Sequence, residues 1–201
     1  MLPNITSMTF PGFTLISGFI AKQPETFITK ERDTWKWKEN SYIVTRPTPT
    51  GKPGEPFIQI LSENRKEMSF KTMDGQVVMR IAKENPMLRS PIYHGMSPAG
   101  DEIWTLALKS GLMSTQYNIT MQDASLSKHS IKIQNEVLGA QKGILLDGIP
   151  VATMGQRGSW SHTHREDVVT VASGMDIVLA LAVNWIKIDK ENDDAAAAVS
   201  T

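Results

Sequence analysis

The C-terminal part of the chain has the most distinctive pattern of apolar positions. A strand-like run, Val168–Ala172, leads through a Ser-Gly pair into a segment without a single polar residue from Ile177 to Val183. Apolar residues resume beyond Asn184, so the expected helix, Met175–Ile188, has no face that could lie against water. Such a helix has to be enclosed by the rest of the protein.

The residues before this helix form short runs that alternate between apolar and polar, with turn signals between them. Asp74-Gly75 and Asp147-Gly148 each separate two such runs, and Asp-Gly readily adopts the positive φ of a tight hairpin turn. A third hairpin is expected across Pro98–Asp101. Many short strands at regular spacing predict a barrel or a sandwich, and a β protein that ends in an enclosed helix most simply closes its sheet around it. The expected strands include Ser41–Arg46, Met68–Met73, Gln76–Ala82, Ile103–Leu108, Gln116–Met121, His129–Gln134, Gly143–Leu146 and Val151–Met154.

The expected helix has its own start signal. Ser173 and Asp176 stand at the spacing of a capping box, in which the hydroxyl and the acid each satisfy a free backbone N–H. Asp176 also suits the positive end of the helix dipole. The spacing therefore favours a structural role for this pair over a catalytic carboxylate.

The run VASGMDIVLALAVNWIKID, Val171–Asp189, resembles the segment with which LURP-one-related proteins of the tubby-like superfamily end. The order of the upstream hairpins is similar too, so the resemblance covers about Tyr42 to Lys190. It implies a mainly β fold: a closed antiparallel barrel of about twelve strands around a hydrophobic C-terminal helix. The chain departs from the family in the long insert Gln156–Asp167 and in a shortened Asp-Gly turn. Related tubby domains bind phosphoinositides, but none of their binding residues aligns here.

Composition sets limits on organisation and partners. The chain has 201 residues, 40% of them hydrophobic, which suits one domain over residues 1–190 and a disordered acidic, Ala-rich tail over 191–201. Lys and Arg total 21, as do Asp and Glu, so there is no overall field to attract nucleic acid. The chain has no Cys and no basic signal-like start, and we expect a cytoplasmic protein, monomeric by default. The fourteen residues Met175–Ile188 span about 21 Å, too short to cross a bilayer.

A basic segment near the N-terminus is the candidate lipid site. Alternation of Trp and Lys over Trp35–Lys38 places the indoles on one face of an extended segment and the lysines on the other. A charged, solvated strand face with Trp packed inward remains the competing interpretation, because Glu31, Asp33 and Glu39 lie among the basic residues. The candidate headgroup ligands are Lys30, Arg32, Lys36 and Lys38.

Signals for catalysis are weaker. His162 and His164 would share a strand face, and Glu166 or Asp167 could add oxygen, but three well-placed metal ligands are not visible. Ser residues near these His lack the G-x-S-x-G elbow of a hydrolase, and no phosphate-binding loop occurs. We therefore expect neither a cofactor nor a metal, and a protein that is not an enzyme.

Three functions remain open from the sequence. The first is recognition of a phosphoinositide or an anionic membrane surface, with the protein peripheral to the membrane. The second is a protein-interaction or structural scaffold. The third and weakest is a hydrolase or metal enzyme that uses the Gln156–Asp167 loop.

Overall fold

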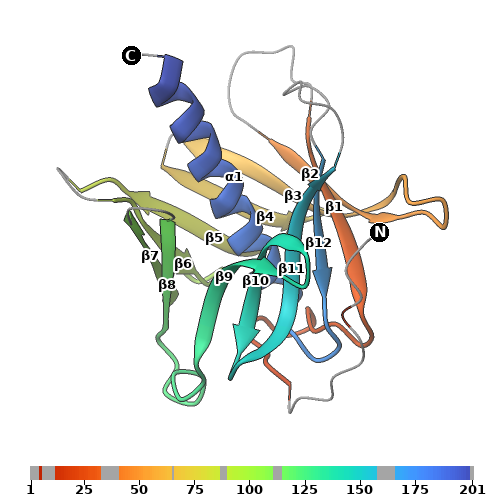
Figure 1. Ribbon diagram of the computed structural model, residues 1–201, viewed down its shortest axis with the longest axis horizontal. Coiled ribbons are helices and arrows are strands. Elements are labelled where there is room, and N and C mark those ends of the chain that lie inside the picture. Colours follow the sequence, from red (N-terminus) through yellow and green to blue (C-terminus); the bar gives the residue numbers. More distant parts are fainter. Residues whose placement is uncertain are drawn as a thin grey trace.

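The architecture is one sheet followed by one helix (Figure 1). The computed structural model describes Ile5 and residues 12–32, 41–64, 66–86, 90–110, 115–157 and 166–199. The elements in these ranges are β1 (Glu25–Glu31), β2 (Tyr42–Pro47), β3 (Pro53–Asn64), β4 (Glu67–Thr72), β5 (Val77–Glu84), β6 (Ile92–Met96), β7 (Glu102–Ser110), β8 (Thr115–Met121), β9 (Ile131–Val137), β10 (Ala140–Leu146), β11 (Ile149–Arg157), β12 (Glu166–Val171) and α1 (Ile177–Val199).

The sheet is a closed antiparallel barrel. Each strand pairs with the next one along the chain, and β1 also pairs with β12, which leaves no open edge. The three expected hairpins are present as β4–β5, β6–β7 and β10–β11. Asp147 and Gly148 have φ of 52° and 83°. This is the positive-φ conformation of a tight hairpin turn, which Asp-Gly readily adopts. The predicted mainly β barrel is confirmed.

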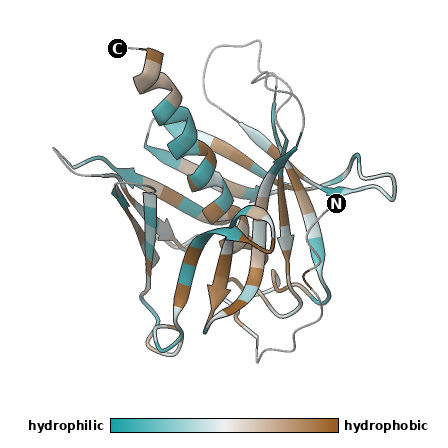
Figure 2. Ribbon diagram, in the orientation of Figure 1, coloured by the Kyte–Doolittle hydropathy of each residue, from teal (hydrophilic) through white to brown (hydrophobic). Residues whose placement is uncertain are grey.

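The helix α1 fills the barrel. All its residues from Ile177 to Ile188 are buried, whereas those from Asp193 onward are exposed. Figure 2 shows α1 changing from brown to teal as it leaves the barrel. A barrel much wider than eight strands has a lumen that strand side chains alone do not fill, so the apolar helix completes the core.

One end of the barrel is plugged by the N-terminal segment. Phe13 donates its backbone N–H to the carbonyl of Gly174 at 2.8 Å, and Ala21 donates to Met175 at 2.9 Å. Both side chains are buried in the main core. We call this the plug end, and the opposite end, where α1 leaves, the exit end.

Two expectations about the helix need correction. It begins at Ile177 rather than Met175, and it continues to Val199, so residues 191–199 are helical instead of forming a disordered tail. Alanine has the highest helix propensity, and a helix already fixed by the barrel extends at little cost. Ion pairs hold the extension, with Asp193 2.7 Å from Lys83 and Asp194 paired with Lys190.

Enclosure of α1 predicts a large effect of one buried charge. Leu181 is 1% exposed, and Leu181→Asp would bury a carboxylate without a partner, at a cost of several kcal/mol. We expect this variant to be insoluble or unfolded by circular dichroism. Ala197→Asp, on the exposed part of the same helix, is the control and should melt like the wild type. Normal melting of Leu181→Asp would mean that the enclosed helix is not central to stability.

Candidate functional site

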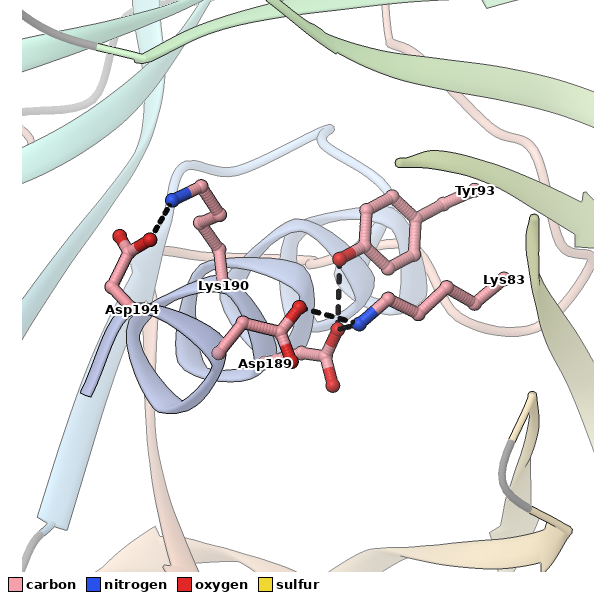
Figure 3. A network of polar contacts seen from close by, with 6 residues as sticks. Lys83, Tyr93, Asp189, Lys190 and Asp194 are labelled. Atoms are coloured by element: carbon pink, nitrogen blue, oxygen red, sulfur yellow. Dashed lines mark hydrogen bonds and ion pairs between the residues drawn. The ribbon is translucent and has the colours of Figure 1, made fainter. Parts of the chain in front are cut away.

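The exit end is lined by polar side chains that project inward from the strands toward α1. Lys83 on β5 places Nζ 2.6 Å from Oδ2 of Asp189 and 2.7 Å from Oδ2 of Asp193, while the Tyr93 hydroxyl donates to Asp189 at 2.8 Å (Figure 3). Burial lowers the pKa of Lys83, but the two carboxylates outweigh it and raise that pKa. Burial and Asp189 raise the pKa of Tyr93, which keeps it a donor. We call the set Lys83, Tyr93, Tyr117, Asn135, Lys142 and Asp167 the exit mouth.

A buried ion pair lies deeper in the exit mouth. Nζ of Lys187 on α1 is 2.9 Å from Oδ1 of Asp167 on β12, and the two side chains are 2% and 3% exposed. Lys187 also pairs with Glu191 one turn later, at 3.4 Å. Removing one partner of such a pair leaves an uncompensated buried charge, so this contact fixes the position of α1 along the barrel.

Lys142 on β10 has a different environment. Its Nζ donates to Oδ1 of Asn135 at 2.6 Å and lies 4.2 Å from the centre of the Tyr117 ring. The residue is 8% exposed. Burial, aided by the positive charge of Lys187 and opposed by Glu191, lowers the pKa of Lys142 to about 8. This amine therefore changes charge close to physiological pH.

A groove opens beside Lys142 at the β9–β10 hairpin. It is an open groove of about 700 Å³, lined by Asn135, Glu136, Gly139, Ala140 and Gln141. Asn135 thus belongs both to the wall of the groove and to the hydrogen bond with Lys142.

The predicted lipid ligands lie on the rim of the exit end, so far as they are described. Lys30 is half-buried near the end of β1, opposite Glu166 of β12, and Glu166 pairs with Arg157 at 3.0 Å. Arg32 is exposed, and its backbone N–H donates to Ser41 at 2.8 Å. Lys36 and Lys38 lie outside the described residues.

The candidate metal loop is described only at its two ends. His162 and His164 lie outside the described residues. Gln156 belongs to β11 and Asp167 to β12, so the ends of the insert are paired strands. The two carboxylates that could serve as metal ligands each pair with a cation: Glu166 with Arg157, and Asp167 with Lys187. Within the described ranges, no three His, Asp or Glu side chains cluster as a metal site would require.

The capping box is replaced by a different arrangement. Asp176 is itself the N-cap, and its Oδ1 accepts from Leu179 N–H at 2.9 Å. Its Oδ2 accepts from Leu15 and Ile16 at 2.8 and 2.7 Å, while Ser173 donates to the carbonyl of Lys22. Burial raises the pKa of Asp176, and these backbone N–H groups oppose the rise. Asp176 alone caps the helix, and Ser173 binds the segment before β1 instead.

The fold is similar to that of a protein of unstated function from Arabidopsis thaliana known from an X-ray structure. The alignment covers 90% of this chain and 99% of the plant protein, with a TM-score of 0.59 and 12% identity. At this identity the likeness extends to fold alone. No family model matches the chain, and no curated protein does. None of the described helices has the length and apolar character to span a membrane.

The role of Asp176 is tested by its amide. In Asp176→Asn one oxygen becomes an NH₂ group, which cannot accept from the backbone N–H groups that now converge on the carboxylate. Each buried donor left unpaired costs about 1–3 kcal/mol, so we expect a loss of about 3 kcal/mol or more in denaturant unfolding. Ser173→Ala removes one exposed hydrogen bond and should cost about 1 kcal/mol or less. Equal losses of stability for the two variants would instead support a capping box formed by both residues.

The environment of Lys142 predicts a pH dependence of stability. Its pKa is about 8 when folded and 10.5 in the reference state, so the unfolded chain binds more protons between these values. The wild type should therefore gain stability relative to Lys142→Met as pH rises through this window, by on the order of 2 kcal/mol. Urea unfolding at a series of pH values measures the difference. The exposed Lys132→Met is the control, and its difference should stay flat.

Proposed function

We propose that the chain is a LURP-one-related member of the tubby-like superfamily that binds anionic membrane surfaces, through phosphoinositide headgroups, and catalyses no reaction. The observation that carries this proposal is an adjacency at the exit end. Because β11, β12, β1 and β2 are neighbours, the connections 32–41 and 158–165 attach side by side on one rim. Their sequences hold three of the five tryptophans of the chain, and Trp favours membrane interfaces.

The charge of this rim supports the same function. Its described part carries three cations, Lys30, Arg32 and Arg157, against two carboxylates, Glu31 and Glu166. With zero net charge on the whole chain, attraction to a membrane has to be local and short-ranged. A cytoplasmic protein that docks reversibly on the inner leaflet fits both properties.

The proposal predicts weak, salt-sensitive binding to anionic vesicles. Wild-type protein should sediment with vesicles that contain phosphoinositide but not with neutral phosphatidylcholine vesicles. Each basic residue near such a surface contributes about 1 kcal/mol, so Lys30→Gln with Arg32→Gln should weaken binding about 30-fold. Lys36→Glu with Lys38→Glu should abolish it, and at 1 M salt, where screening acts over about 3 Å, binding should largely vanish.

A matched control lies at the plug end. Lys128 and Lys132 are exposed there, and changing both to Gln removes the same charge. That variant should bind vesicles like the wild type. Equal loss for both double variants would indicate a general charge effect, and no binding by the wild type at low salt would refute the membrane proposal in favour of a protein-interaction scaffold.

A further inference from the structure

Lys142 is a buried cation with neutral partners. Its contacts are the Asn135 carboxamide and the Tyr117 ring, and no carboxylate among the described residues lies within ion-pair distance of its Nζ. A buried ammonium without a counter-ion is costly, as its low pKa records. Lys83 and Lys187, by contrast, each pair with two carboxylates.

The nearby acids belong to a different lysine. Asp167 and Glu191 both pair with Lys187, whose positive charge acts against Lys142. Asp189 and Asp193 are held by Lys83 on the far strand β5. The four carboxylates are thus engaged with Lys83 and Lys187, and none of them lies within ion-pair distance of Lys142.

The groove reaches the hydrogen-bond partner of Lys142. The tight turn of the β9–β10 hairpin, with Leu138 and Gly139 at φ of 51° and 79°, leads into the groove wall of Gly139, Ala140 and Gln141. Asn135 separates the groove from Lys142 by a single side chain. The side-chain oxygen of Asn135 accepts the hydrogen bond from Lys142, so the NH₂ group of Asn135 can donate to a ligand. An ammonium and an amide donor together match the two oxygens of a carboxylate.

We propose that this groove is a binding site for a small monocarboxylate, whose oxygens pair with Nζ of Lys142 and Nδ2 of Asn135. A single ammonium without an ion pair favours a ligand with one negative charge. Glu136 on the groove wall disfavours a second negative charge, which argues against phosphate and dicarboxylates. The site is independent of the proposed membrane rim, because neither Lys30 nor Arg32 contributes to it.

The test is a titration with sodium butyrate, followed by backbone amide shifts of Gly139, Ala140 and Gln141 in two-dimensional NMR. Sodium chloride at equal ionic strength is the blank. We expect saturable shifts in the wild type, at least tenfold weaker binding in Lys142→Met, and no change in Lys132→Met. Absence of saturation in the wild type, or equal affinity in Lys142→Met, would overturn the site.

Two further arms keep the outcome decisive. Inorganic phosphate should bind more weakly than butyrate, and tighter phosphate binding would overturn the ligand class. If Lys142→Met does not fold, butyrate binding to the wild type is measured at two pH values instead, about two units below and two units above pH 8. Over that range Lys142 loses its proton. The other titratable groups that face it are Lys187, Glu191, Asp167 and Tyr117, and burial raises the pKa of Tyr117, which keeps its hydroxyl neutral. Butyrate affinity should fall at the higher pH, and constant affinity would contradict a role for the ammonium.

Discussion

The structure depends on the mutual enclosure of α1 and the barrel. Residues from Ile177 to Ile188 have no side that tolerates water, and a barrel of this size has a lumen that strand side chains do not fill. Neither part buries its apolar surface alone. This accounts for the strict up-and-down strand order, because any missing strand would open a path for water to the helix. It also explains why the helix start is fixed so firmly: Asp176 binds α1 and the plug segment with one carboxylate.

Because the enclosed helix is longer than the barrel, it has to pass from the apolar interior into water at the exit end. Backbone and side chains pass there from an apolar lumen to water within about one turn, between Ile188 and Glu191. Charged residues on α1 meet inward-pointing charges from the strands, as in the contacts of Lys83 and Asp167. These pairs fix the depth of the helix, because sliding it by one turn would leave each charge buried without its partner.

Sequence reasoning predicted the structure correctly where a single residue pair or one run of apolar residues determines it. Apolarity on all sides of Ile177–Val183 predicted enclosure, and Asp147-Gly148 predicted a turn, since both depend on local chemistry. It failed where a contact joins distant segments. The partners of Asp176 at Leu15 and Ile16 lie about 160 residues away, so the Ser173 spacing suggested a nearer solution. Lys142 directly precedes the expected strand Gly143–Leu146 and carries no local signal of its role, because alternation cannot show which face points inward near a barrel end. Lys187 is the one charged residue between Ile177 and Ile188, yet nothing near it in the sequence identifies its partner Asp167.

The two proposals share one physical origin. Packing constrains almost every side chain in the interior of the barrel, and the plug end is covered by the N-terminal segment. The exit end is therefore the part of the barrel whose side chains are free to serve binding. Ion pairs there neutralise Lys83 and Lys187 and make them parts of the scaffold. Lys142 is the exception among the described lysines of the mouth, since no described carboxylate lies within ion-pair distance of its ammonium. A buried charge that does not stabilise the fold needs another reason to persist, and a ligand of opposite charge supplies one.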